Sequence, residues 1–338
     1  MLLAVALGIN LTNLGDVDLA GPLHMETTKA NSVVITEEHT MAAPNIWMIT
    51  WGVGFGTCPS DEGQTLDDLE ISAYGVRYGV RKIFDQYGSQ YWLLEAPAND
   101  RTRTTLTIRF KATLTLNRRI LKEGPPEKEP TLPNRSSWLR IDEPEDAAVA
   151  QKWIQSRGLR RIDGERDVVF AKRVLEHIQK GFRYKFIENG ERGVPACVRN
   201  GFGACGELNA LAVDILRLNG IPARLRQGRN AGTNVAWGPE TTNSYHVAAE
   251  FWGEGIGWIP IEASATGPDS NERGLELKPF LGVANGDHVS KHYNFVHLDS
   301  QTRSFQSQDW VFGRWEGTWD GWKVTGQYGV SFTPLVNR

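Results

Sequence analysis

One stretch decides the fold: Gly201-Phe-Gly-Ala-Cys-Gly-Glu-Leu-Asn-Ala-Leu-Ala-Val-Asp-Ile-Leu-Arg217, in which a glycine-rich turn runs directly into an apolar-periodic helix. Cys205 is expected at the first turn of that helix. The unsatisfied backbone N–H groups and the positive end of the helix dipole both favour thiolate over thiol at that place. Since the thiolate is the nucleophilic form, the sequence predicts a reactive cysteine.

A histidine and a carboxylate follow on two strand-like runs. His246 lies in Ser244-Tyr-His-Val-Ala-Ala-Glu-Phe-Trp252, and Glu262 closes Gly257-Trp-Ile-Pro-Ile-Glu-Ala263. The glycine-rich stretch between these runs predicts a turn, because glycine tolerates positive φ, and the runs would then pair as an antiparallel hairpin. If the hairpin is symmetric about Gly255, His246 and Glu262 are diagonal neighbours on one face, about 7–8 Å apart at Cα.

Glu250 is the competing partner for the imidazole, because it lies on the same face of the strand as His246. Four residues of strand rise place it about 13 Å away, so we expect a solvated or structural group there. Cys205, His246 and Glu262 then have the order and types of a nucleophile, a base and an orienting acid. The alternative is a small buried cysteine and a polar histidine without a catalytic role.

These residues resemble the transglutaminase-like superfamily, the papain-related group of bacterial cysteine peptidases, amidases and transglutaminases. The resemblance covers residues 145–298. It implies an α+β fold with a papain-like core, in which the nucleophile helix packs on an antiparallel sheet. It also implies Cys205 as nucleophile, His246 as general base and acid, and Glu262 as orienter. The chain departs from the family in having Glu262 where aspartate is usual. The motifs that carry the resemblance are Gly203-Ala-Cys205-Gly-Glu, Leu216-Arg-Leu-Asn-Gly-Ile-Pro-Ala-Arg-Leu-Arg-Gln-Gly228, His246-Val-Ala-Ala-Glu250 and Gly257-Trp-Ile-Pro-Ile-Glu262.

The rest of the chain predicts a second, β-rich part. Apolar residues occupy every even position from Leu106 to Leu116, which is typical of a strand with one packed and one solvated face. Gly124–Pro130 reads as a linker, and residues 146–157 and 167–179 read as helices. The predicted parts are a segment 1–29 without a clear assignment, a β-rich sandwich-like domain 30–123, a linker 124–144, a catalytic domain 145–298 and a tryptophan-rich β-hairpin or extension 299–338.

Composition predicts a soluble globular chain. The 338 residues carry a formal net charge of −3, and 40% of them are hydrophobic, which gives no electrostatic case for nucleic acid. No stretch has the length of a membrane span, and Met1–Ile9 matches a signal peptide poorly, so a cytoplasmic or an exported bacterial protein both remain open. Cys58 and Cys197 either form a disulfide or, as we favour, are two inert thiols.

Two further clusters of residues lie towards the end of the chain. His288, His292 and His297 crowd together, but they lack a standard ligand pattern, so we expect a loop lining the active-site rim and no metal or cofactor. The tail is aromatic and contains the turn signal Asp320-Gly321. These aromatic residues could form a stacking platform for sugars or peptide side chains. We favour the alternative, in which tryptophans on neighbouring strands hold a hairpin together. The aromatic tail residues are Trp310, Phe312, Trp315, Trp319 and Trp322.

The predicted function is a cysteine-dependent amide-bond hydrolase, a peptidase or amidase, that forms a thioester acyl-enzyme on Cys205. The substrate would be a peptide or protein, with cell-wall peptide as one candidate. Transamidation of protein glutamine by the same site is the alternative, deglycosylation is conceivable, and a non-catalytic binding module on the same fold is the rival class. The Cys205 backbone N–H is the expected oxyanion donor. The sequence does not name a second donor: Tyr184 and Asn200 are candidates, but a structural role is favoured for both.

Overall fold

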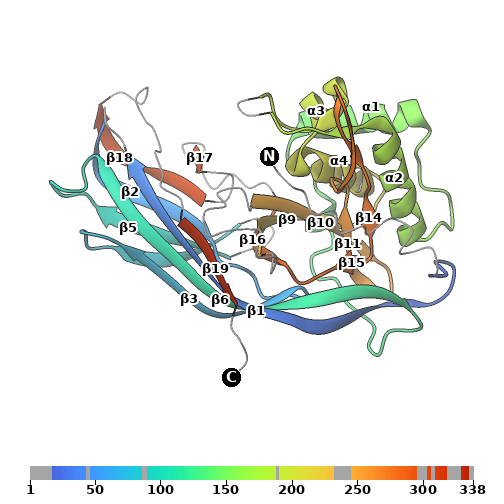
Figure 1. The fold of residues 1–338 in the computed structure, drawn as a ribbon, viewed down its shortest axis with the longest axis horizontal. Coiled ribbons are helices and arrows are strands. Elements are labelled where there is room, and N and C mark those ends of the chain that lie inside the picture. The colour runs from blue at the N-terminus through green and yellow to red at the C-terminus, as the bar shows by residue number, and fades with distance from the viewer. Residues whose placement is uncertain are drawn as a thin grey trace. The chain divides into compact units, whose positions relative to one another are not determined.

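The computed structural model describes residues 17–42, 46–85, 90–187, 190–231, 245–294, 303–305, 309–317 and 329–334 (Figure 1). The chain divides into two compact units, each of which draws on separate stretches of sequence. The first unit comprises Met1–Thr28, Arg119–Arg226 and His246–Ala284, and the second comprises Lys29–Arg118, Gln227–Tyr245 and Asn285–Arg338.

Along the chain, the described elements are first a series of strands, then the helices with two short strands among them, and then a second series of strands. The helices are α1 (Pro144–Arg157), α2 (Asp167–Gly181), α3 (Val194–Asn200) and α4 (Cys205–Leu218), with a single 3-10 turn, η2 (Ser137–Leu139). The strands are β1 (Leu23–Ala42), β2 (Ile46–Gly56), β3 (Gln64–Ala73), β4 (Gly79–Phe84), β5 (Gln90–Pro97), β6 (Thr105–Glu123), β7 (Arg183–Tyr184), β8 (Phe202–Gly203), β9 (Ala223–Asn230), β10 (Tyr245–Gly253), β11 (Gly257–Glu262), β12 (Thr266–Asn271), β13 (Gly274–Leu277), β14 (Phe280–Leu281), β15 (Val283–Ala284), β16 (His288–Tyr293), β17 (Arg303–Phe305), β18 (Asp309–Gly317) and β19 (Gly329–Pro334).

The first unit has the predicted α+β architecture. One of its sheets has the order β14-β11-β10-β9 and another has the order β12-β13-β7-β8, and α1, α2 and α3 all contact α4. Figure 1 shows the four helices gathered beside β10 and β11. Leu208 to Arg217 of α4 are all buried, because the helix is enclosed by its neighbours. The predicted α+β fold, with the helix that begins at Cys205 beside an antiparallel sheet, is therefore confirmed.

The two helices that precede this core match their sequence patterns. α1 begins at Pro144, since proline is tolerated in the first turn, and ends before Gly158, whose φ of 61° is left-handed. α2 runs two residues beyond the predicted Asp167–Gln179. Its apolar stripe is buried, as the helical spacing predicts.

The hairpin of β10 and β11 has the predicted register. Gly253 pairs with Gly257 and Ala249 with Ile261, so the ladder is symmetric about Gly255. Gly255 has φ of 70°, the conformation for which a glycine was expected. Because strand side chains alternate between faces, this register settles which side chains share the face of His246.

The second unit is built from strands. One sheet has the order β17-β18-β2-β5-β4, and in the other β1 pairs with β19 and β3 pairs with β6. The predicted alternation along β6 is confirmed, because its even residues from Leu106 to Leu116 are at most 1% exposed. They belong to a core that also includes Trp51 and Phe55. In the described part of the chain, no helix is long and apolar enough to cross a membrane.

The histidine cluster is not the predicted loop. His288 is the first residue of strand β16 and His292 is the last but one. His297 lies outside the described residues. His292 is buried against the ring of Tyr91, and this burial, together with the Lys291 charge, lowers its pKa to about 3. Among the described residues, no group of three His, Cys, Asp or Glu is arranged to hold a metal ion.

The aromatic tail is described only in part. The backbone of Trp310, Phe312 and Trp315 belongs to β18, which pairs with β2 and β17. Trp319 and Trp322, and the turn signal Asp320-Gly321 between them, lie outside the described residues.

Among the described glycines of the second unit, Gly228 makes the tightest approach to another backbone segment. A Cβ atom added there would overlap the carbonyl oxygen of Val289, which belongs to the backbone of β16 and cannot rotate away. We expect Gly228→Ala to lower the free energy of unfolding by about 2–3 kcal/mol or more, the upper range for overpacking.

Denaturant unfolding of the full chain tests this expectation. Gly79→Ala is the matched control, because nothing lies within 4 Å of the added Cβ on the exposed strand β4. Equal unfolding midpoints for Gly228→Ala, Gly79→Ala and the unsubstituted protein would contradict the predicted overlap.

Candidate active site

Cys205 is the first residue of α4, as the sequence predicts. The preceding residue, Ala204, is extended, and its backbone N–H donates to the Glu207 carboxylate at 2.9 Å. Arg192 pairs with the same carboxylate at 3.1 Å. Because alanine has no side-chain acceptor, Glu207 supplies the side-chain half of the helix cap. The start of the helix at Cys205 is therefore fixed by Glu207, which contacts both the Ala204 backbone and Arg192.

The turn before Cys205 needs its glycines. Gly201 has φ of 69°, and a Cβ at Gly203 would lie 2.9 Å from the sulfur of Cys197. Lys185 donates its backbone N–H to the Gly203 carbonyl at 2.9 Å, which aligns β7 with β8. The chain can pass Cys197 and enter the helix only because these positions carry no side chain.

The three cysteines differ in their surroundings. None of them forms a disulfide, and Cys58 and Cys197 are buried whereas Cys205 is partly exposed. Burial, and then the Glu207 carboxylate, raise the pKa of Cys197 to about 12, so its thiol stays protonated. The expectation of two inert thiols beside one accessible cysteine agrees with this arrangement.

His246 and Glu262 meet as diagonal neighbours on the hairpin. The imidazole Nε2 lies 2.7 Å from the carboxylate Oε2, and the two side chains are 21% and 8% exposed. Burial alone lowers the pKa of His246, but the Glu262 charge and hydrogen bonds with Cys205 and Glu262 raise it well above its ordinary value. Since Nε2 faces the carboxylate, the other ring nitrogen is left for the thiol. The structure brings the three predicted residues together.

Glu262 is held by more than the imidazole. Its Oε1 accepts hydrogen bonds from Asn209 Nδ2 at 2.8 Å, from the Ser264 backbone N–H at 2.9 Å and from Ser264 Oγ at 2.6 Å. Burial raises the pKa of this carboxyl, but His246 and these donors lower it below its ordinary value. The carboxylate is therefore ionised beside the imidazole at neutral pH.

Sequence reasoning missed Asn209 and Ser264. For Asn209 the sequence did offer a signal. It is a polar residue in an apolar helix, and it lies four positions, about one helical turn, after Cys205. Of the two residues considered as oxyanion donors, Asn200 is exposed at the end of α3. Tyr184 lies near the site: burial, followed by the negative charges of Cys205 and Glu262, raises its pKa, so that its hydroxyl stays protonated.

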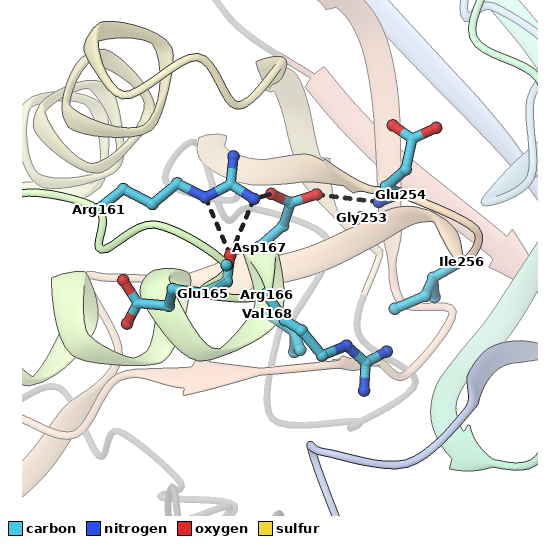
Figure 2. A pocket seen from close by; sticks show the side chains of 9 residues that line it. Arg161, Glu165, Arg166, Asp167, Val168, Gly253, Glu254 and Ile256 are labelled. Atoms are coloured by element: carbon cyan, nitrogen blue, oxygen red, sulfur yellow. Dashed lines mark hydrogen bonds and ion pairs between the residues drawn. The ribbon is translucent and has the colours of Figure 1, made fainter.

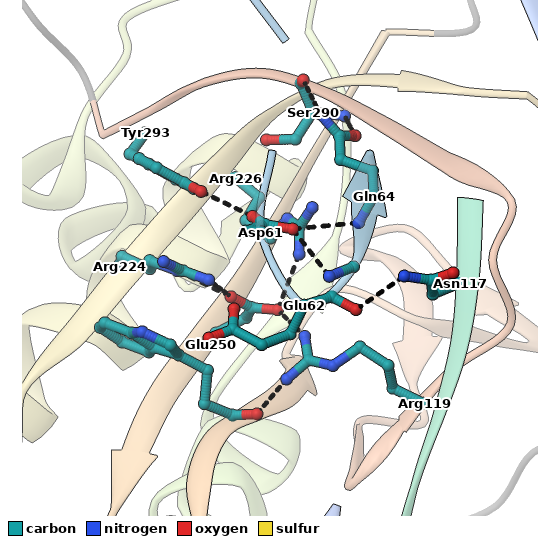
Figure 3. A network of polar contacts seen from close by, with 12 residues as sticks. Asp61, Glu62, Gln64, Asn117, Arg119, Arg224, Arg226, Glu250, Ser290 and Tyr293 are labelled. Carbon is teal, nitrogen blue, oxygen red and sulfur yellow. Dashed lines mark hydrogen bonds and ion pairs between the residues drawn. The ribbon is translucent and has the colours of Figure 1, made fainter. Parts of the chain in front are cut away.

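Glu250 is a structural group, but the alternative of a solvated group is wrong. Its side chain is 2% exposed, and it forms ion pairs with Arg224 at 2.6 Å, with Arg226 at 2.9 Å and with Arg119 (Figure 3). Burial raises its pKa, but the three arginines together lower it well below the ordinary value. Arg119 also donates to the Trp258 carbonyl on the partner strand. The carboxylate thus ties the hairpin to β9 and β6.

A pocket of about 260 Å³ lies elsewhere in the first unit (Figure 2). Arg161 pairs with Asp167 at 2.6 Å, and Asp167 accepts the backbone N–H of Glu254 at 3.0 Å. Cys205, His246 and Glu262 are not among the residues that line it. Its polar contacts therefore fasten the start of α2 to the hairpin turn and play no part in the arrangement around Cys205.

Comparison with known proteins agrees with the resemblance. Residues 160–263 match the model of the transglutaminase-like superfamily. A proposed cysteine protease from Cytophaga hutchinsonii has a similar crystal structure, with a TM-score of 0.60 and 15% identity over 93% of this chain and 94% of that one. The periplasmic domain of TgpA from Pseudomonas aeruginosa aligns with a TM-score of 0.32 and 15% identity over 70% of this chain and 87% of that one. No curated protein matches the sequence.

Proposed function

From the transglutaminase-like core that residues 160–263 form, we propose that the chain is a cysteine-dependent amide-bond hydrolase, a peptidase or amidase. The observation that carries the proposal is the connected series of contacts from Cys205 through His246 to Glu262. A nucleophile, a base and an orienting carboxylate in hydrogen-bond contact are the parts that acyl transfer requires.

The proposed reaction has two halves. The Cys205 thiolate attacks the amide carbonyl carbon, and His246 gives its proton to the leaving amine as the C–N bond breaks, which leaves a thioester. In the second half, His246 takes a proton from water, whose oxygen displaces the Cys205 sulfur and releases the acid. Glu262 keeps the imidazole oriented in both halves and stabilises its protonated form.

Negative charge develops on the carbonyl oxygen during the attack and needs hydrogen-bond donors. The backbone N–H of Cys205, at the start of α4, is the first donor in this proposal. We assign the second to the Tyr184 hydroxyl, because its raised pKa keeps the proton on the oxygen and its position lies near Cys205 and Glu262.

The products distinguish the two reactions that a thioester allows. We expect incubation with peptide and cell-wall peptide libraries to yield hydrolysed fragments in mass spectra, with or without an added primary amine. Incorporation of the amine in place of hydrolysis would support transamidation instead. No product in either condition, together with alkylation of Cys205 by iodoacetamide no faster than that of free cysteine, would favour a binding module.

The pH dependence of hydrolysis follows from His246. Its raised pKa keeps the imidazolium charged above about pH 6.5, where an ordinary histidine loses its proton. Activity that needs the thiolate–imidazolium pair should therefore extend into alkaline solution and fall only as pH rises through the raised pKa. Glu262→Gln removes the charge that raises this pKa, so the alkaline limb should move to lower pH. The measurement is kcat/KM against pH.

Glu272→Gln is the matched control, because Glu272 is exposed in the turn between β12 and β13. We expect its profile to coincide with that of the unsubstituted protein. If Glu262→Gln and Glu272→Gln have the same alkaline limb, Glu262 does not act on the imidazole.

A further inference from the structure

Asn209 connects the helix that begins at Cys205 to both strands of the hairpin. Its side chain is fully buried on α4. The amide Nδ2 donates to the Val247 carbonyl at 2.8 Å and to Glu262 Oε1 at 2.8 Å. Its Oδ1 accepts the backbone N–H of Ala263 at 2.9 Å. One side chain therefore contacts the residue after His246 on β10, Glu262 itself, and the residue after Glu262.

The orientation of this amide is determined by its partners. Both N–H bonds point to acceptors, the Val247 carbonyl and the Glu262 carboxylate, and the carbonyl oxygen faces a donor. A rotated amide would place an oxygen against the carboxylate and an NH₂ group against the Ala263 N–H. Only one of the two amide orientations satisfies all three contacts, so Asn209 links the helix to the hairpin in a fixed geometry.

The link also fixes the orientation of the Glu262 carboxylate beside the imidazole. Oε1 of Glu262 receives donors from Asn209 and Ser264, whereas Oε2 faces His246. A glutamate reaches about 1.5 Å further than the aspartate usual in the family, the length of one C–C bond. The hydrogen bonds that Asn209 and Ser264 donate to Oε1 restrict the longer Glu262 side chain to one conformation.

We propose that Asn209, together with Ser264, is a positioning residue that aligns the helix of Cys205 with the hairpin and fixes the orientation of the Glu262 carboxylate beside His246. The inference rests on the proposed function, because positioning matters only if Cys205 and His246 react as a pair. It extends the site from three residues to five, with the two additional side chains acting through Glu262 and not on the substrate.

Asn209→Asp is the isosteric test. The new carboxyl must be protonated to donate to Glu262, and two carboxyl groups that share a site hold one proton more tightly than usual. The other titratable groups at Glu262 are His246 on β10, Cys205 on α4 and Tyr184 on β7. In the variant, the two carboxyl groups should therefore share one proton at low pH. When this proton is lost at higher pH, the two carboxylates repel each other and move apart.

The readout is the rate of Cys205 alkylation by iodoacetamide from about pH 5 to 9, with the modified peptide identified by mass spectrometry. We expect Asn209→Asp to approach the unsubstituted protein at the acidic end and to fall roughly 10- to 100-fold below it at the alkaline end, the loss typical of a deleted hydrogen bond to a charged group. A purely structural role would lower the rate equally at every pH.

Asn219→Asp is the control on the same helix. Asn219 bonds the Ile215 carbonyl and the Arg161 backbone N–H at the far end of α4. Its variant should lose stability without a change in the shape of the alkylation profile. If Asn209→Asp and Asn219→Asp give profiles of the same shape, Asn209 has no positioning role.

Ser264→Ala keeps the inference testable if Asn209→Asp does not fold. It removes the hydroxyl donor to Glu262 Oε1 and keeps the backbone donor, so we expect a folded variant with a several-fold lower alkylation rate. An unchanged rate would overturn the proposal. Slow alkylation in the unsubstituted protein would instead refute the proposed function, so the two failures are distinguishable.

Discussion

Replacing either Cys205 or His246 by alanine is expected to lower kcat by about 10⁴- to 10⁶-fold, and replacing both should cost little more than either alone. The reason is that the two side chains form one hydrogen-bonded unit. Without the imidazole, the thiol has no base beside it and the leaving amine receives no proton. Without the thiol, the imidazole has no nucleophile to activate. The measurement is single-turnover hydrolysis of the peptide identified in the library.

Cys197→Ala is the matched control for the thiol. Cys197 is a buried cysteine eight residues from Cys205, and its raised pKa keeps it protonated. We expect its variant to retain kcat and to lose some stability, since a small cavity replaces the sulfur. Losses that multiply in the double variant Cys205→Ala and His246→Ala would show that the two residues act independently, contrary to the proposed mechanism.

Replacing Glu250 by alanine should lower the free energy of unfolding by about 3–5 kcal/mol, the cost of breaking a buried ion pair from one side. The change leaves Arg119, Arg224 and Arg226 buried without their shared carboxylate. All three guanidinium groups are at most 7% exposed, so water cannot replace the lost partner, and their like charges repel. Urea unfolding of the full chain measures the loss.

Glu254→Ala, on the turn of the same hairpin, is the control for the loss of one negative charge. Its carboxylate is 79% exposed and lies 3.6 Å from Arg135, an arrangement that contributes little in water. We expect a change within about 0.5 kcal/mol. If Glu250→Ala is no more destabilising than Glu254→Ala, the buried arginines find other partners and the cluster does not anchor the hairpin.

The hairpin of β10 and β11 was predictable in detail because the sequence features that define it are neighbours in the chain. A glycine-rich turn and a period of two residues are enough to derive the register of β10 and β11, and hence the meeting of His246 and Glu262. The roles of Cys205, His246 and Glu262, and the domain boundaries drawn from the sequence, stay proposals. The helices α1 and α2 were predictable for the same local reason, since apolar spacing and a proline define them.

The surroundings of Glu250 and β16 were not predictable, because they depend on residues far away in the chain. Arg119 lies 131 residues before Glu250, and no local pattern indicates that a strand face will meet buried arginines. In β16, the crowded histidines predict a loop. The structure buries Lys291 against Glu37 at 2.7 Å, which removes the cost that makes a buried lysine rare.

Strand β10 carries His246 at one end and Glu250 four residues further on. An activity screen of random variants would therefore group Glu250 with Cys205 and His246 as intolerant positions, although Glu250 contacts no reacting group. Only activity normalised to the folded fraction would separate them. For engineering, substitutions that alter specificity are best introduced in proteins that keep the arginine cluster intact, because the strand that carries His246 depends on the charges that anchor it.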